Sequence, residues 1–241
     1  MSTNLSDIDI DVDVLFRLKG SSTPSHAEHC QQLWLIAKSL ERIGLDIKQW
    51  GIGDVSDSGG LVNTPAFTDI GPTDAAVESV TESPDIAEQS FSVWNGTEGQ
   101  NGAAFSMSYS LKNLSIFELK TEGLEKLYTS MALSGLLVDA VKIWPAEVAQ
   151  VAPYLYSQKK VFPDRPGVGW MLYLPHALTP AQVPDARALI PVMRDDTQQG
   201  TIIVSVTDEV FDANNREHVK IANDIEIRLA DQDLLPRFVD L

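Results

Sequence analysis

Cysteine and long apolar runs are nearly missing from this sequence. Its 241 residues include one cysteine, Cys30, so no internal disulfide can form and nothing favours an oxidising compartment. The first twenty residues alternate Asp with Ile and Val instead of placing a basic stretch before an apolar run, so we expect no secretory signal. No apolar run reaches the ~18 residues that a membrane span needs. These absences predict a cytoplasmic protein without a membrane partner.

Basic residues are also scarce. Lys and Arg total 18 against 34 Asp and Glu, so the formal net charge is 18 − 34 = −16. A chain of this charge repels phosphate, which argues against sequence-independent binding of nucleic acid. Acidic surfaces instead attract basic partners. With 44% apolar residues, the chain still has enough material for a sizeable core.

The opening of the chain has the clearest local pattern. Residues Ile8 to Leu18 alternate between two faces, which predicts a half-buried strand. One face carries Ile8, Ile10, Val12, Val14, Phe16 and Leu18, and the other carries Asp7, Asp9, Asp11 and Asp13. Ser25 and Glu28 form a capping box, and apolar residues then recur at helical spacing until Gly44. We therefore expect a helix packed on the first strand.

Later segments continue a mixed pattern of strands and helices. Strands are expected at Asp46–Trp50, Gln89–Trp94, Ala103–Leu111, Leu114–Lys120, Val168–Leu174 and Thr201–Val206, and helices near Asp74–Thr81 and at Leu124–Lys142 and Asn214–Ala230. The fold class is α+β, with antiparallel or mixed sheets and packed helices. We treat residues 1–241 as a single domain. Two similar α+β halves, divided near 112–124, remain an open alternative.

Two metal motifs fail on inspection. Asp7, Asp9 and Asp11 have the spacing that opens a calcium loop, but Val12 stands where the turn needs glycine and Leu18 where it needs a carboxylate. His26 and His29 would share a helical face, but no second ligand cluster completes a site. We therefore expect no metal and no cofactor.

One enzyme-like pattern is present. Pro84-Asp85 lies upstream of Glu118-Leu119-Lys120, and restriction-type nucleases use a carboxylate followed by Glu-x-Lys to hold Mg²⁺ and a water. However, residues 49–111 contain nine acidic residues and no Lys, Arg or His, so a duplex would meet an unfavourable potential. The preferred interpretation is that the chain is not an enzyme, and a metal-dependent nuclease or hydrolase is the alternative.

Residues 162–175, which read FPDRPGVGWMLYLP, resemble the Immunity protein 52 family. The Trp94-Asn95-Gly96 turn, residues 200–204 and the closing segment from His218 to Pro236 extend this resemblance over most of the chain. The resemblance implies an α+β protein encoded beside a bacterial polymorphic toxin. Such toxins commonly carry a restriction-endonuclease-like domain and are often delivered by type VI secretion. The implied partner is that cognate toxin.

The expected function is neutralisation of the toxin by protein–protein occlusion, with an adaptor or chaperone that loads the effector as a further alternative. Complementary charge would speed the encounter. A homodimer also remains open. The candidate contacts form three acidic sets: Asp7, Asp9, Asp11 and Asp13; Asp54, Asp57, Asp69 and Asp74; and Asp195, Asp196, Asp208, Glu209 and Asp212. The sequence does not choose among these sets.

Overall fold

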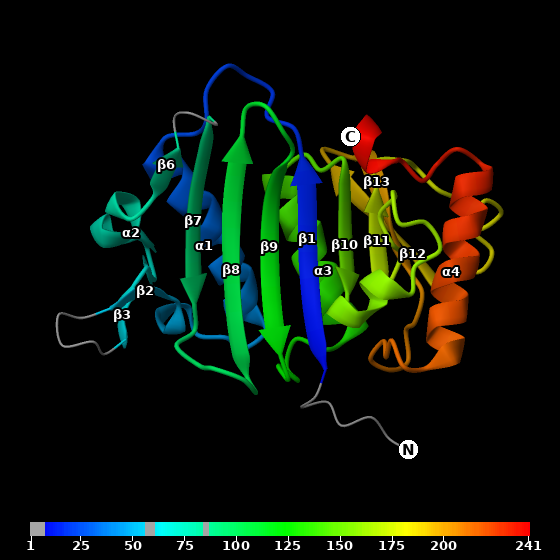
Figure 1. The fold of residues 1–241 in the computed structure, drawn as a ribbon, viewed down its shortest axis with the longest axis horizontal. Helices are drawn as coiled ribbons and strands as arrows, with labels where there is room; N and C mark the ends of the chain where they lie inside the picture. The colour runs from blue at the N-terminus through cyan, green and yellow to red at the C-terminus, as the bar shows by residue number, and fades with distance from the viewer. Residues whose placement is uncertain (1–7, 56–60, 84–86) are drawn as a thin grey trace.

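A single large antiparallel sheet organises the molecule (Figure 1). This computed structural model describes residues 8–55, 61–83 and 87–241. The strand order is β12-β13-β11-β10-β1-β9-β8-β7-β2-β3, and β6 pairs with β7. The strands are β1 (Asp9–Phe16), β2 (Gly51–Val55), β3 (Leu61–Pro65), β6 (Thr81–Ser83), β7 (Glu88–Trp94), β8 (Gly102–Ser110), β9 (Ser115–Glu122), β10 (Val148–Ala152), β11 (Met171–Leu174), β12 (Ala188–Arg194) and β13 (Thr197–Val204). A separate short hairpin pairs β4 (Phe67–Thr68) with β5 (Gly71–Pro72).

Strand β1 lies near the centre of the sheet, between β9 and β10. Its apolar residues Ile10, Val12 and Val14 are fully buried, and Asp11 and Asp13 lie on the opposite face. The alternation in the sequence therefore predicted both the strand and the direction of its faces. The expected meander is also confirmed, because β7, β8 and β9 pair in order through antiparallel ladders.

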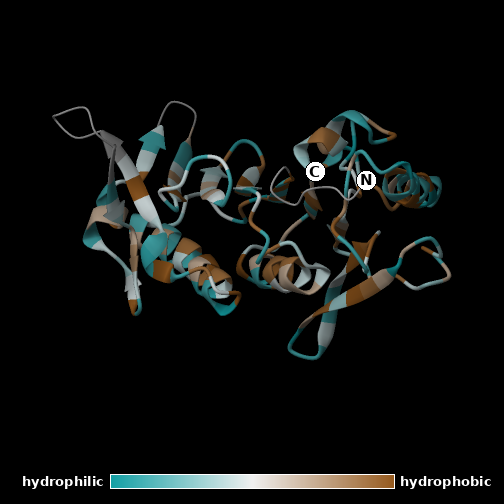
Figure 2. Ribbon diagram, turned by 90° about the horizontal axis from the view of Figure 1, so that it is seen from below, coloured by the Kyte–Doolittle hydropathy of each residue, from teal (hydrophilic) through white to brown (hydrophobic). Residues whose placement is uncertain are grey.

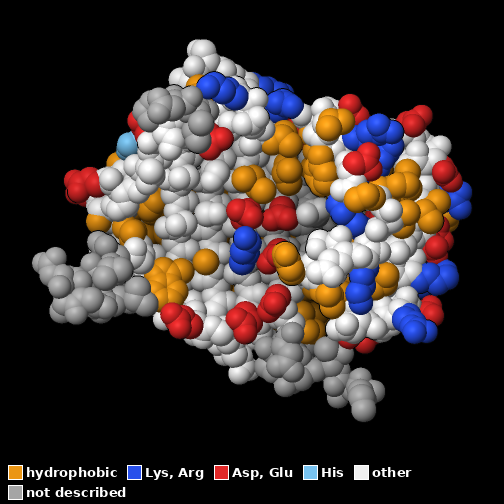
Figure 3. Space-filling view, viewed as in Figure 1, with side chains coloured by type: hydrophobic (Ala, Val, Ile, Leu, Met, Phe, Trp, Pro, Cys, Tyr) orange, Lys and Arg blue, Asp and Glu red, His pale blue; other side chains and the backbone are white. Residues whose placement is uncertain are grey.

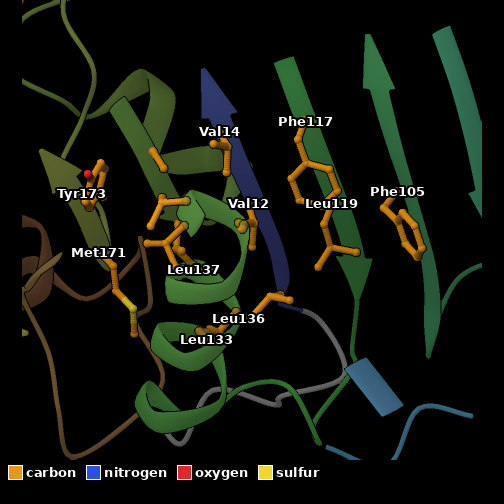
Figure 4. Close-up of a cluster of buried hydrophobic side chains, with 14 of the residues drawn as sticks. Val12, Val14, Phe105, Phe117, Leu119, Leu133, Leu136, Leu137, Met171 and Tyr173 are labelled. Carbon is orange, nitrogen blue, oxygen red and sulfur yellow. The ribbon is translucent and has the colours of Figure 1, made fainter. Parts of the chain in front are cut away.

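Helices α1 (His26–Arg42) and α3 (Ser130–Ile143) cover one face of the sheet (Figure 2). The capping box between Ser25 and Glu28 starts α1, and Gly44 follows its end with a φ of +90°, a conformation that glycine adopts without strain. Figure 4 shows apolar side chains of α3 directed at the sheet. The cluster labelled there comprises Val12, Val14, Phe105, Phe117, Leu119, Leu133, Leu136, Leu137, Met171 and Tyr173. This helix layer leaves the other side of the central strands uncovered.

Helix α4 (Arg216–Asp231) lies at the β11–β13 end of the molecule (Figure 1). Its buried Glu226 accepts hydrogen bonds from the Tyr156 hydroxyl (2.6 Å) and from the backbone N–H groups of Val161 and Val168 (2.8 and 2.9 Å). Burial raises the pKa of Glu226, while these donors oppose the shift. The carboxylate thereby attaches residues 156–168 to the helix. No helix within the described ranges is long and apolar enough to cross a membrane.

Two of the expected elements differ from the structure in type or start, and a third is confirmed. Residues Asp46–Trp50 do not form a strand but enclose a 3₁₀ turn, η2 (Ile47–Gln49), because the Asp46 side chain accepts from the Lys48 N–H and caps it. Helix α3 begins at Ser130 and not at Leu124, because Thr129 caps it by accepting from the Ala132 N–H. The short helix α2 (Asp74–Glu78) lies where it was expected.

Seven described strands have no counterpart among the expected strands, namely β2, β3, β4, β5, β6, β10 and β12. Sequence features of β10 and β12 explain why these two were not expected. Strand β10 reads VAQVA, and its two alanines weaken the β-strand signal. Strand β12 contains Pro191, and proline is disfavoured in strands because it cannot donate to a ladder. It is tolerated here because β12 ends the strand order of the sheet and pairs only with β13 among the described strands.

Candidate functional site

The uncovered side of the central strands carries a group of carboxylates, which we call the acidic face. It comprises Asp9, Asp11 and Asp13 of β1 and Glu118 and Glu122 of β9, with Lys120 among them. Figure 3 shows acidic side chains gathered around a basic one over the middle of the sheet. Because side chains alternate along a strand, the same pattern that buries the core residues places these groups on the opposite side.

Strand pairing sets the register of the acidic face. Asp9 lies opposite Glu122, Asp13 opposite Glu118, and only Asp11 lies opposite a cation, Lys120. Lys120 Nζ is 3.4 Å from Glu118 Oε1. On the other flank, Gln150 of β10 donates to Asp13 Oδ2 over 3.0 Å. Like charges directly opposite one another destabilise a sheet, so this arrangement lowers the stability of the fold.

The pKa values of Asp11 and Asp13 are both raised in this arrangement. Burial raises the pKa of Asp11 to about 6, with the negative charges of Asp13, Asp9 and Glu118 adding to the shift and Lys120 opposing it. Burial and the charge of Glu118 also raise the pKa of Asp13, while the hydrogen bond from Gln150 and the charge of Lys120 oppose this. Both carboxylates therefore hold their charge less readily than free aspartate.

A wall borders the acidic face on the β10 side. It is formed by the 3₁₀ turn η3 (Tyr154–Gln158), in which Tyr154 is 68% exposed. The groove beside it has a volume of about 410 Å³ and is lined by Asp9, Asp11, Trp94, Lys120, Glu122 and Tyr154, among others. Tyr156 of the same turn is buried and bonded to Glu226, which fixes the turn on α4. The groove thus combines carboxylates with two aromatic side chains on a rigid support.

Serine side chains extend this surface toward β7. Ser90 and Ser92 of β7 lie opposite Ser108 and Ser106 of β8, and these four residues line a shallow depression. They leave the carboxylates uncovered, because serine is too short to reach over the neighbouring strand. The uncovered face is therefore flat and polar on one side of the carboxylates and walled on the other.

The structure brings together only part of the predicted set. Asp9, Asp11 and Asp13 share the acidic face, whereas Asp7 and Asp57 lie outside the described residues and only the backbone of Asp54 is described. Asp69 lies on the exposed β4–β5 turn, 3.4 Å from Lys48, and Asp74 is the first residue of α2.

The third set lies in two other places. Asp195 and Asp196 form the tip of the β12–β13 hairpin, both with positive φ. Asp208, Glu209 and Asp212 lie in the loop between β13 and α4, where Glu209 contacts His218 at 2.9 Å. These residues belong to elements far from β1 in the strand order. Sequence reasoning missed Glu122 as a contact and weighed Glu118 only as a nuclease residue, although β9 shows the same alternation as β1.

Only the Glu118-Leu119-Lys120 part of the nuclease-like pattern lies within the described residues. Glu118 and Lys120 lie on the same face of β9, but Pro84 and Asp85 lie outside the described residues. In the part of the chain that is described, no three His, Cys, Asp or Glu side chains are arranged to hold a metal ion. His26 Nε2 is instead 2.8 Å from Glu82, and the buried His29 Nδ1 is 2.8 Å from Gln89 Oε1.

The fold and the acidic face define an antiparallel α+β protein, covered by helices on one side of its central strands and carboxylate-lined on the other. The chain belongs to the Immunity protein 52 family, whose model matches residues 75–237. Immunity proteins bind a cognate toxin.

Among solved structures, a type VI secretion system (T6SS) protein of Pseudomonas aeruginosa is similar, with a TM-score of 0.53 and 12% sequence identity. The match covers 97% of this chain and 87% of that chain. This similarity shows a shared fold. No curated protein matches the sequence.

Proposed function

We propose that this protein neutralises a cognate toxin by binding it through the acidic face, without catalysis of its own. The observation that carries the proposal is the register of β1 and β9, which places Asp9 and Asp13 opposite glutamates on an uncovered surface. Such pairs destabilise a sheet. A surface that is maintained at a cost in stability is best explained by a binding role, because residues at functional sites often conflict with local rules of stability.

The chemistry of the acidic face favours a basic toxin surface. Alternate residues of a strand are ~6–7 Å apart, so Asp9, Asp11 and Asp13 form a row of negative charges comparable in spacing to successive phosphates. A nuclease toxin with a restriction-endonuclease-like domain presents Lys and Arg where its substrate backbone lies. Occupation of that surface by the carboxylates would exclude nucleic acid. Trp94 and Tyr154 at the groove supply aromatic rings of the kind that anchor protein interfaces.

Growth rescue in cells that express the toxin tests this proposal. The triple variant Asp9→Asn/Asp11→Asn/Asp13→Asn should lose protection, because it removes three negative charges from the acidic face while keeping similar side-chain shapes. The matched control is Asp69→Asn/Asp74→Asn/Asp208→Asn, which removes the same charge from exposed positions elsewhere. Circular dichroism establishes that both variants fold. Protection by the first variant equal to that by the control would exclude the acidic face as the binding surface.

Binding kinetics separate charge attraction from shape. Raising salt should slow association of the wild-type protein and leave dissociation nearly unchanged, because exposed charges act mainly on encounter and are screened over ~8 Å at physiological ionic strength. The triple variant should associate slowly at every salt concentration. A wild-type association rate that ignores salt would contradict electrostatic attraction. A complex that forms without protecting the cells would assign the protein to effector loading instead of inhibition.

A further inference from the structure

A second groove lies on the helix side of the molecule, away from the acidic face. It has a volume of about 810 Å³ and lies between the end of α1, the outer side of α3 and strand β12. Its apolar lining includes Met131, Ala132, Val138 and Ile190. Figure 2 shows the β12–β13 hairpin extending to the same side of the sheet as α1 and α3. The hairpin therefore forms one wall of a surface whose floor is α3.

The outer side of α3 is unusual for a helix that only covers a sheet. Gly135 lies in the helix interior, where glycine is destabilising relative to alanine. Apart from its chain neighbours and the backbone of its own helix, a Cβ at this position would meet no described atom within 4 Å, so packing inside the monomer does not require glycine. One turn earlier, Met131 is 84% exposed. A missing side chain beside an exposed methionine is typical of a surface that another backbone approaches closely.

Charge distinguishes this groove from the acidic face. Its charged lining consists of Arg42, Lys126 and Asp139, so cations outnumber anions there although the whole chain carries −16. Arg42 is ion-paired with Asp139, and Lys126 Nζ donates to the Gly44 carbonyl oxygen over 3.1 Å. Lys126 has three donor protons and is exposed, so it can donate a further hydrogen bond to an acidic group of a partner.

The tip of the β12–β13 hairpin has the complementary charge. Asp195 and Asp196 are exposed there. Arg194, the residue before them, donates to the Lys142 carbonyl oxygen over 2.6 Å, which fixes the tip near the C-terminal end of α3. Lys126, in contrast, precedes the N-terminal end of α3. One molecule therefore carries an acidic tip at one end of the groove and a cation at the other.

We infer that a second copy of this chain docks on this groove, with the two α3 helices antiparallel and crossing at Gly135. An antiparallel crossing brings the C-terminal end of one α3 beside the N-terminal end of the other, so Asp195 and Asp196 of each copy meet Lys126 of its partner. The same patch serves both copies, as a two-fold interface requires. The helix side is suited to this contact because two chains of −16 repel one another through their acidic surfaces. Both acidic faces remain uncovered in such a dimer.

The mass of the purified protein tests the inference directly. Light scattering after size exclusion should give twice the 26.4 kDa chain mass at ~50 μM wild-type protein. Gly135→Trp fills the crossing point and should give the monomer mass. Gly20→Trp is the matched control, because Gly20 also has open space within 4 Å among the described atoms. A monomeric wild type, or a dimer that withstands Gly135→Trp, would overturn the inference.

A charge exchange tests the orientation and does not depend on the folding of the tryptophan variant. Lys126→Glu should raise the Kd of the dimer at least tenfold, because it places a carboxylate beside the partner's acidic tip. Combining it with Asp195→Asn/Asp196→Asn should restore much of the association, and asparagine tolerates the positive φ at both positions. Lys19→Glu, exposed on the loop after β1, is the charge control. Failure of the tip variant to restore association would exclude the antiparallel arrangement.

Discussion

Neutralising Asp11 should make the isolated protein more stable. The pKa of Asp11 is about 6 in the folded protein against 3.8 for a free aspartate, so the unfolded chain binds fewer protons between these values. Stability therefore falls as pH rises from about 4 to 6. The shift corresponds to about 3 kcal/mol at pH 7. Because Asp11 is only partly buried, solvent screening reduces our expectation for Asp11→Asn to a gain of about 1–2 kcal/mol.

Urea unfolding followed by tryptophan fluorescence measures this gain. At pH 7 the variant should be stabilised by about 1–2 kcal/mol, equivalent to a rise in Tm of roughly 2–8 °C for a chain of this size. At pH 5 the gain should shrink to roughly half, because Asp11 is then mostly protonated in the folded protein. Asp208→Asn, at an exposed loop position, should change stability by less than about 0.5 kcal/mol. Loss of stability in the Asp11 variant at pH 7, or a gain of equal size at pH 5, would refute the electrostatic reasoning.

Three further predictions concern the core and the absence of catalysis. Trp170→Ala should cost about 3–5 kcal/mol of unfolding free energy in urea titrations, because Trp170 is 0% exposed and its Nε1 donates to the Val206 carbonyl oxygen. Glu226→Ala should cost about 3 kcal/mol by the same measurement and Glu226→Gln less, since the amide oxygen still accepts. Purified protein should not cleave DNA or RNA with Mg²⁺ or Mn²⁺, and cleavage abolished by Lys120→Ala would contradict this.

The elements that the sequence predicted well are those whose local residue pattern matches their burial in the fold. Strand β1 alternates because one face packs in the core under α3 and the other is only partly buried, and α1 carries its start signal in Ser25 and Glu28. Strand β10 could not be predicted, since its five residues have a weak propensity and it forms only by pairing with β1 and β11. Strand β12 could not be predicted because it contains Pro191. Proline is tolerated in a strand at the edge of a sheet, and the local sequence does not specify that position.

The candidate site was predictable only in part for the same reason. The β1 aspartates were found from their own alternation, but Glu118 follows Asp13 by more than a hundred residues in the sequence. Their contact depends on the register of β1 with β9, which the whole core determines. In the sequence alone, Glu118 and Lys120 resemble part of a short nuclease motif. In the folded protein they belong to one charged surface with Asp11 and Asp13.

Acid should weaken the complex with a basic toxin. Lys or Arg beside Asp11 would stabilise its ionised form, so binding is strongest where the carboxylate is already charged. With a pKa of about 6, Asp11 is roughly nine-tenths ionised at pH 7 and roughly one-tenth ionised at pH 5. The pKa of Asp13 is raised as well, because of burial and the charge of Glu118.

Calorimetric titrations at pH 7 and pH 5.5, with Asp11→Asn as the comparison, test this linkage. The wild-type Kd should rise on acidification by more than that of the variant, because the variant lacks the titrating group while every histidine of both proteins remains. Equal pH dependence in the two proteins would show that Asp11 does not contact the basic surface of the toxin. The contact would then shift along the acidic face toward Asp9 and Glu122, which lie opposite one another where β1 begins and β9 ends.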